Sequence, residues 1–326
     1  MLATVSHGRQ QKHIASRHLD FDGEYIRQRL NCTWFTLMHR LSDHELFTLP
    51  RLIQLASATA RLRPDCLHYD VDACFVGQRW DETAPSQWPV DETIRRIQHA
   101  GAWIVIRQAQ LDPLYGELLR GCIDELLEHA DPLLARDIEN TEAILFITSP
   151  NRLTTYHIDR ECNFLFQIAG EKTIHIFDRE DREILPETEI ERFWAVDNNA
   201  AIYKPHLQDR AESFVLRPGN GVHIPINSPH WLQNGDSVSI SLNLNFRFKD
   251  RVAGNLYRAN YFLRRMGIVP TPPGRSRLRD AVKARVATGI KNGIDATPDV
   301  VKDAVKQIFR KTERRANLTL LRRLEQ

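Results

Sequence analysis

The stretch LTTYHIDRECNFLFQIAGEKTIHIF, residues 153–177, decides the fold. Two runs rich in β-forming residues lie on either side of Gly170, which predicts two short strands joined by a turn. His157 and Asp159 are two positions apart, and residues i and i+2 of a strand point to the same face. We therefore expect an imidazole and a carboxylate to project together into the interior of a β structure.

Further short strands are predicted on both sides of this stretch, between residues 142 and 248. They are EAILFIT (142–148), NFLFQIAG (163–170), KTIHIFD (172–178), SFVLRPG (213–219), GVHIPI (221–226) and SVSISLNLNFRF (237–248). Several short strands separated by turn residues are typical of an antiparallel sandwich or barrel. Upstream, AWIVIRQ (102–108) predicts a buried strand, and residues 45–63, 91–100 and 111–129 predict helices that buttress the β core. The last helix has Asp112 as its cap and Pro113 at its first position.

A third ligand for a metal would come from the segment after Pro218, which offers His223 and His230. Two histidines and one carboxylate on one face form the facial triad of non-haem Fe(II), which leaves coordination positions open for other ligands. From the residues alone, either histidine can complete the set.

Three spaced motifs resemble the JmjC and cupin-like 2-oxoglutarate/Fe(II) oxygenases, especially the branch of the hypoxia-inducible-factor asparaginyl hydroxylase. The first is T-x-x-H-x-D-x-x-x-N-F from Thr154 to Phe164, and Q-I-x-G-x-K follows from Gln167 to Lys172. The third is P-G-x-x-x-x-I-P from Pro218 to Pro225, with His230 five residues later. The resemblance implies a mainly β protein with a double-stranded β-helix (cupin or jelly-roll) core, N-terminal buttressing helices and a C-terminal helical extension.

The resemblance also implies roles for individual residues. The iron ligands would be His157, Asp159 and His230, with His223 as the competing third ligand because the family usually has an aromatic residue there. Lys172 would pair with the distal carboxylate of 2-oxoglutarate, and Thr154 would hydrogen-bond the same end. Asn163 and Asn245 match amides near the cosubstrate and iron. The implied reaction uses Fe(II), 2-oxoglutarate and O₂ to hydroxylate an unactivated C–H bond of a protein, peptide or small molecule, releasing succinate and CO₂.

Charge divides the chain. Residues 251–326 hold 18 basic and 6 acidic residues, a balance of +12, whereas residues 1–250 hold 26 and 36, a balance of −10. We expect an N-terminal arm and lead-in (1–44), an oxygenase domain (45–250, with its β core at about 142–248) and a basic helical extension (251–326). A helix from Thr297 would carry the apolar stripe Val301, Val305 and Ile308, and by analogy with the hydroxylase branch it would join two copies in a homodimer.

The alternative function is a non-catalytic cupin-like sensor or transcriptional regulator whose basic tail binds nucleic acid, although few aromatic residues follow Phe262 to stack on bases.

Composition sets outer limits. The chain has 326 residues, of which 42% are hydrophobic and 26% charged, which is ordinary for a globular protein. No apolar run approaches the roughly 18 residues of a membrane span. The start lacks the apolar core of a secretion signal, and the five cysteines have no metal-finger spacing. These features predict reduced thiols and a cytoplasmic location.

Overall fold

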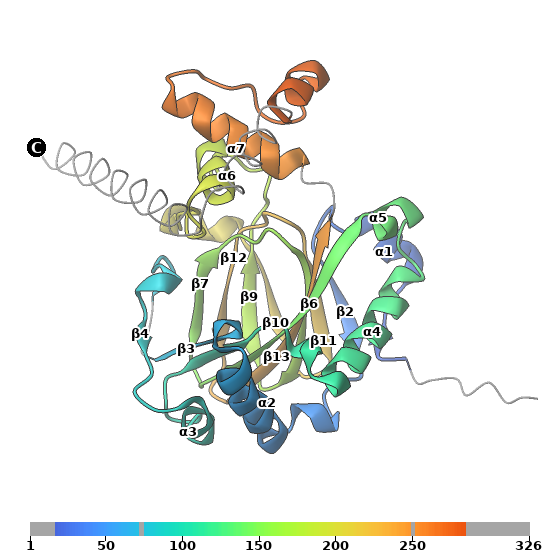
Figure 1. Ribbon diagram of the computed structural model, residues 1–326, viewed down its shortest axis with the longest axis vertical. Helices are drawn as coiled ribbons and strands as arrows, with labels where there is room; N and C mark the ends of the chain where they lie inside the picture. The colour runs from blue at the N-terminus through green and yellow to red at the C-terminus, as the bar shows by residue number, and fades with distance from the viewer. Residues whose placement is uncertain (1–16, 72–74, 249–251, 285–326) are drawn as a thin grey trace, which may run out of the picture.

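The computed structural model describes residues 17–71, 75–248 and 252–284. Two antiparallel sheets face each other (Figure 1). The smaller sheet has the order β10 (Glu212–Leu216), β9 (Lys172–Ile176), β12 (His230–Asn234), β7 (Leu153–His157). In the larger sheet, the described strands run in the order β1 (Leu19–Asp20), β2 (Phe35–His39), β11 (Asn220–Ile224), β8 (Cys162–Ala169), β13 (Ser239–Phe248), β6 (Ile138–Thr148), β5 (Trp103–Ile106), β3 (Leu67–Val71), β4 (Ala84–Pro85).

The eight strands from β6 to β13 form a jelly roll. Strands β11, β8, β13 and β6 are neighbours in the larger sheet, and β10, β9, β12 and β7 make up the smaller one. Consecutive strands from β6 to β9 alternate between the two sheets, as do β11, β12 and β13, which is the connectivity of a double-stranded β-helix. The predicted fold class is confirmed.

The helices with described bounds are α1 (Gly23–Arg29), α2 (Leu49–Leu62), α3 (Val90–Arg95), α4 (Pro113–Leu127), α5 (Pro132–Arg136), α6 (Glu187–Ala195) and α7 (Val252–Arg265). Short 3₁₀ turns lie at Glu45–Phe47, Pro64–Cys66, Trp80–Glu82, Ala109–Leu111 and Pro205–Arg210. The predicted cap is present, because the Asp112 carboxylate accepts a hydrogen bond of 3.1 Å from the backbone N–H of Leu114. The predicted helix over 91–100 is shorter than expected and ends at Arg95.

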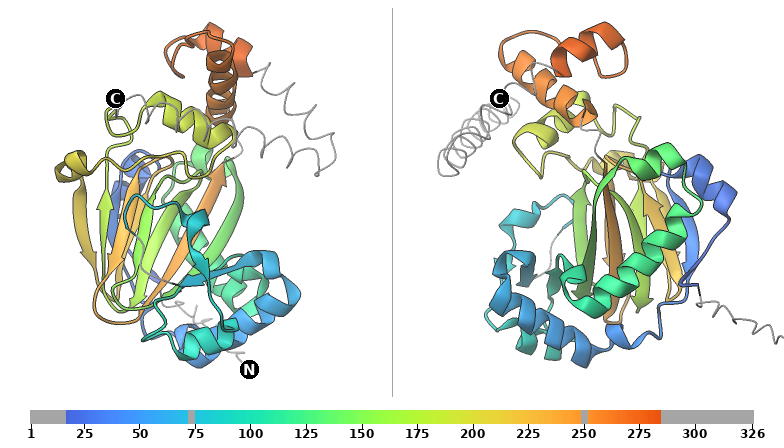
Figure 2. Two further views of the ribbon diagram at one scale, coloured as in Figure 1. Left: turned by 90° about the vertical axis from the view of Figure 1, so that its left-hand side faces the viewer. Right: turned by 45° about the vertical axis from the view of Figure 1, so that its right-hand side comes forward.

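The larger sheet is covered on its outer face by helices. Helices α2 and α4 lie across that face (Figure 2), and their apolar side chains belong to the same core as Phe164, Phe166 and Leu244. The inner face packs against the smaller sheet through a second cluster that includes Leu165, Ile174 and Leu232. Strand β8 is therefore buried on both faces, which explains why seven consecutive residues are buried and the strand shows no strict alternation of buried and exposed side chains.

At both expected domain boundaries, an element on one side of the boundary packs against an element on the other side. Strand β2 precedes residue 45 yet pairs with β11, with Thr36 opposite Val222, so the sheet begins before the expected start of the oxygenase domain. Helix α7 follows residue 250 and packs on α6, where Arg264 pairs with the buried carboxylate of Glu191. The predicted helix with Val301, Val305 and Ile308, and with it the expected dimer contact, lies outside the described residues. Within the described ranges, no helix has both the length and the apolar character needed to cross a membrane.

The turn between β8 and β9 requires glycine at Gly170. Its φ is +71°, and an added Cβ would lie 2.2 Å from the carbonyl oxygen of Val238. Gly219 also has a positive φ of +90°, but an added Cβ there would meet no atom closer than 3.5 Å. Gly170 thus combines a backbone constraint with a close approach, while Gly219 has only the backbone constraint.

We predict that Gly170→Ala lowers the free energy of unfolding by about 1–3 kcal/mol more than Gly219→Ala, because only the first adds a steric clash to the left-handed backbone. Urea denaturation of the two variants and the parent measures the difference. Equal losses in the two variants would contradict the close packing of this turn.

Candidate metal centre and its cavity

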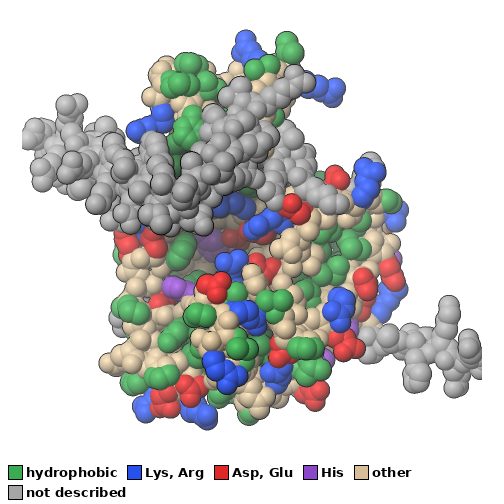
Figure 3. Space-filling model, in the orientation of Figure 1, with side chains coloured by type: hydrophobic (Ala, Val, Ile, Leu, Met, Phe, Trp, Pro, Cys, Tyr) green, Lys and Arg blue, Asp and Glu red, His purple; other side chains and the backbone are tan. Residues whose placement is uncertain are grey.

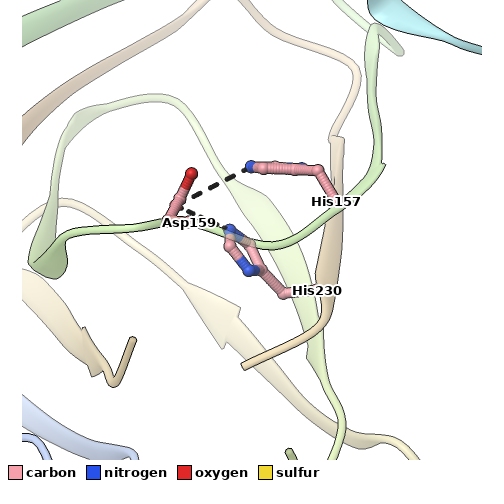
Figure 4. Close-up of side chains that lie close together, drawn as sticks. All are labelled: His157, Asp159 and His230. Atoms are coloured by element: carbon pink, nitrogen blue, oxygen red, sulfur yellow. Dashed lines mark ion pairs between the residues drawn. The ribbon is translucent and has the colours of Figure 1, made fainter. Parts of the chain in front are cut away.

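Two strands of the smaller sheet and one loop bring three potential ligands together (Figure 4). His157 is the last residue of β7 and His230 is the first of β12, and the two are paired in register. Asp159 Oδ2 lies 3.9 Å from His157 Nε2 and 3.8 Å from His230 Nε2. All three ligand atoms lie within 4.8 Å of one another, which is close enough to share one metal ion.

The proposed reason for the His157–Asp159 pairing is wrong in one respect. Strand β7 ends at His157, so Asp159 lies in the following loop and not two positions along the same strand. The carboxylate reaches the site because the chain turns there, and the Asn163 side chain donates a hydrogen bond of 3.0 Å to Asp159 Oδ2. The loop and the hydrogen bond from Asn163 position the Asp159 carboxylate, and strand alternation does not.

Backbone carbonyls orient both imidazoles. Nδ1–H of His157 donates to the Thr155 carbonyl at 2.7 Å, and Nδ1–H of His230 donates to the Ser228 carbonyl at 2.9 Å. A carbonyl can only accept, so each Nδ1 carries the proton and each Nε2 presents a lone pair toward Asp159. This arrangement, with one ring nitrogen held by the protein and the other free, is typical of histidines that bind metals.

The electrostatics of the cluster favour a bound cation. Burial, followed by the neighbouring His157, lowers the pKa of His230 well below its usual value, so the imidazole is neutral. Burial raises the pKa of Asp159, while His157 and the hydrogen bond from Asn163 act in the opposite direction. Metal binding requires neutral histidines and an ionised carboxylate, and a cation at this point would favour the ionised form of the half-buried Asp159.

His223 is placed elsewhere, with both ring nitrogens engaged. Its Nε2 accepts a hydrogen bond of 2.9 Å from the backbone N–H of Asn31, and its Nδ1–H donates to the Asn163 carbonyl at 3.0 Å. The ring is fully buried and packs 4.7 Å from the rings of Phe35 and Phe164. Burial lowers its pKa to about 3, so it is a neutral core histidine. Of the two candidate histidines, the structure brings His230 to the pair.

A cavity of about 500 Å³ contains the cluster. Figure 3 shows charged and histidine side chains around a hollow on one face of the molecule. Every residue predicted for the site lines the cavity, namely Thr154, His157, Asp159, Asn163, Lys172, His230 and Asn245. The inner faces of both sheets therefore contribute to one site.

Lys172 is the most unusual side chain of this cavity. It is 4% exposed and lies on the inner face of β9, the face that it shares with Ile174 and Ile176. Burial lowers its pKa from 10.5 to about 8. Among the described residues, no carboxylate or hydrogen-bond acceptor pairs with its amine. A buried cation without a counter-ion is costly, so this position favours an anionic ligand in the cavity.

Sequence reasoning missed several residues of the cavity wall. The Asn243 amide donates to Asn245 Oδ1 at 3.0 Å, and Asn243 Oδ1 and Asn163 Oδ1 are buried acceptors without a partner in the described part of the chain. The alternation of Ser241, Asn243 and Asn245 with leucines was a readable signal of a polar inner face. The wall residues Trp80, Trp103, Arg160 and Phe193 gave no such signal, because long-range packing brings them to the cavity.

Comparisons with known proteins give distant similarities. No protein-family model matches the chain. HSPB1-associated protein 1 of Mus musculus is 28% identical over 111 residues, which are 31% of this chain and 23% of that protein. The Homo sapiens protein of the same name is 27% identical over the same shares. The chain thus matches less than a quarter of the length of these curated relatives.

Solved structures of YcfD from E. coli are also similar to this chain. One has a TM-score of 0.46 and 12% sequence identity, and the match covers 83% of this chain and 67% of that one. Another, of the ribosomal oxygenase YcfD in complex with cobalt and succinic acid, has a TM-score of 0.43 and 13% identity. That match covers 81% of this chain and 64% of the other.

We predict that Ala in place of His157, Asp159 or His230 weakens binding of Co(II) or anaerobic Fe(II) by more than about 100-fold, because each change removes a ligand and not only an outer-shell contact. His223→Gln keeps hydrogen-bonding capacity in the core and is expected to bind metal as the parent does. Isothermal titration calorimetry measures all four affinities. Loss of metal in the His223 variant alone would overturn the assignment of the third ligand.

Proposed function

We propose that this protein is an Fe(II)- and 2-oxoglutarate-dependent oxygenase that hydroxylates an unactivated C–H bond of a protein, peptide or small molecule. The observation that carries the proposal is the buried, unpaired amine of Lys172 in the same cavity as a cluster of two histidines and one carboxylate. A facial triad and a separate fixed cation are the two elements that a metal with a dianionic cosubstrate needs.

The residues of the cluster fit the metal by donor type and orientation. His157, Asp159 and His230 would hold Fe(II) through two Nε2 atoms and one carboxylate oxygen, and Asn163 would keep that carboxylate in place. When bound, the iron supplies oxidative decarboxylation of 2-oxoglutarate coupled to oxygen insertion, with succinate and CO₂ as products. The protein's own part is to fix the ligands, bind the cosubstrate and keep the cavity dry.

Lys172 and Thr154 would bind the distal carboxylate of 2-oxoglutarate. In the smaller sheet, Lys172 is paired with Asn234 of β12, and Thr154 is paired with Leu232 of the same strand. The two side chains therefore flank β12 on opposite sides, two residues apart along the strand. His230 lies four residues earlier on β12, roughly 13 Å along the strand. A lysine side chain and an extended dicarboxylate can together span that separation.

Arg247 is another cation of the cavity wall, and it already has a partner. Its guanidinium hydrogen-bonds the carboxylate of Glu161, which stabilises its charge. The alternative function, a cupin-like regulator that binds nucleic acid through its tail, has no use for a buried lysine beside a ligand cluster. The oxygenase accounts for both features.

Turnover provides the direct test. Purified protein with Fe(II), 2-oxoglutarate and O₂ is expected to form succinate, and treated cell extract is expected to contain a product that has gained one oxygen atom, detected by mass spectrometry. Under anaerobic conditions, Fe(II) plus 2-oxoglutarate should give a weak visible charge-transfer band. A protein that binds Fe(II) but shows neither the band nor succinate would refute the proposed chemistry.

We predict that Lys172→Met weakens 2-oxoglutarate binding by about 10- to 150-fold, the loss of charge-assisted hydrogen bonds of roughly 1.5–3 kcal/mol. Metal affinity is expected to stay the same. The matched control is the double variant Glu161→Gln/Arg247→Gln, which removes the neighbouring ion pair without changing net charge. Calorimetry on the Co(II) protein measures each affinity. A larger loss in the double variant than in Lys172→Met would move the cosubstrate cation to Arg247.

We predict a pH dependence set by Lys172, whose pKa of about 8 is below its unfolded value of 10.5. Between these values the unfolded chain binds more protons, so this residue's contribution to the free energy of unfolding rises with pH. A dianion prefers the protonated amine, so 2-oxoglutarate affinity should fall as pH rises above about 8. Calorimetry at pH 7 and pH 9.5 tests this. The Lys172→Met variant should lose the pH dependence, and its persistence there would assign it to another group.

A further inference from the structure

Four lysine and arginine side chains of the described residues line the cavity: Arg107, Arg160, Lys172 and Arg247. Two of them are paired, since Arg107 contacts Glu142 at 3.2 Å and Arg247 contacts Glu161. Under the proposed function, Lys172 binds the cosubstrate. Arg160 is then the one described cation of the cavity that has neither a carboxylate partner nor an assigned ligand.

Arg160 follows the ligand Asp159 directly in the chain, and its guanidinium is held in place without being neutralised. It lies over the rings of Phe193, at 4.7 Å, and Trp194, at 5.6 Å, and donates a hydrogen bond to the Phe193 carbonyl. Its Nε–H is a buried donor with no partner in the described ranges. The aromatic faces and the carbonyl orient the group but supply no full negative charge.

The surroundings of Arg160 are positively charged. A second guanidinium, that of Arg258, lies 5.5 Å from the centre of the Trp194 ring that Arg160 also contacts, and Glu161, the next residue along the chain, is already bonded to Arg247. Repulsion of this kind is relieved when an anion arrives. Guanidinium groups also match carboxylate and phosphate oxygens in shape, because the planar fork can donate two parallel hydrogen bonds.

The part of the cavity wall that strands β3, β5 and β6 contribute includes aromatic side chains. Strands β3, β5 and β6 extend the floor past the metal cluster and contribute His68, Trp103 and Phe146, and Trp80 joins them from its 3₁₀ turn. His68 lies 5.6 Å from the Trp103 ring and 6.1 Å from the Trp80 ring. Such a surface binds apolar or planar groups and offers few hydrogen bonds.

We propose that the primary substrate is an anion whose carboxylate or phosphate group is bound by Arg160, while a ring or apolar portion lies on the Trp80–Trp103 wall. This inference rests on the proposed function for the identity of the second ligand, 2-oxoglutarate. With the cosubstrate bound to Lys172 and the metal, Arg160 is the remaining unpaired cation of the cavity among the described residues. It would act as a specificity-determining residue.

Three probes of similar size test the inference: phenyl phosphate, benzoate and benzyl alcohol. Each is titrated by calorimetry into the Co(II) protein saturated with 2-oxoglutarate, so that Lys172 is already occupied. At least one anion is expected to bind about 10- to 150-fold more tightly than the neutral alcohol, the value of a charge-assisted contact. Whether phenyl phosphate or benzoate binds more tightly identifies the anionic group.

Arg160→Met keeps an apolar side chain over Phe193 and removes the charge. It is expected to abolish the preference for the anion, while Co(II) affinity, 2-oxoglutarate affinity and the melting temperature stay as in the parent. Arg160→Lys, which keeps the charge, should recover part of the preference. Equal binding of the three probes by the parent would overturn the proposal. So would a lower 2-oxoglutarate affinity in Arg160→Met, or a general loss of stability that affects every ligand alike.

A protein that does not use 2-oxoglutarate would give a different result in these titrations. If the parent protein does not bind 2-oxoglutarate, the same probes are titrated into the Lys172→Met variant loaded with Co(II), where Arg160 is again the unpaired cation. Anion binding that depends on Arg160 in that variant would retain the anion site and reject the cosubstrate. Probe binding that is indifferent to Arg160 would reject the anion site itself.

Discussion

The pairing of β12 between β7 and β9 is the constraint on which the rest of the site depends. One register aligns His230 with His157 on one side and Ile176 on the other, and it aligns Asn234 with Lys172 at the far end of the strand. A shift of β12 by one residue would turn its own side chains, His230 and Asn234, to the opposite face of the sheet and take His230 out of the ligand cluster. The ligand cluster and the buried amine are therefore two consequences of a single backbone arrangement.

That arrangement costs stability, because amide, imidazole and ammonium groups occupy positions between two sheets where apolar side chains would pack. The compensation lies on the other face of the larger sheet. There, Phe164, Phe166 and Leu244 belong to one large core with the helices that cover the sheet. Strand β8 serves both purposes, since Asn163 faces the cavity while Phe164 faces the helices. The buttressing helices make a polar interior tolerable.

Local features of the structure could be predicted well from the sequence, and long-range features could be predicted poorly. Most of the jelly-roll strands, the Asp112 cap and the seven expected residues of the cavity followed from short patterns and from spaced motifs. Strand parity could also have separated His223 from His230: Val222 and Ile224 belong to the cluster between the sheets, so their neighbour His223 must face the other way. Strand β2 and the cavity residues Trp80 and Arg160 were missed, because only tertiary packing joins them to the sheet or the site. Asp159 was placed correctly for a mistaken reason, since its loop and Asn163 position it.

The positions of Lys172 and Arg160 along the cavity predict where each anionic ligand binds. Lys172 is nearly inaccessible at the end of β9 that follows the β8–β9 turn, whereas Arg160 is only partly buried, in the loop after Asp159 beside α6. The ligand cluster belongs to the Arg160 end, because His230 opens β12 four residues before the level of Lys172. Under the proposed function, a dicarboxylate held by Lys172 and the metal would occupy the more buried end of the cavity, and a substrate held at Arg160 would lie at the other end. The two anions would therefore be separated along the cavity, with the buried cation binding the cosubstrate and the more exposed cation binding the substrate.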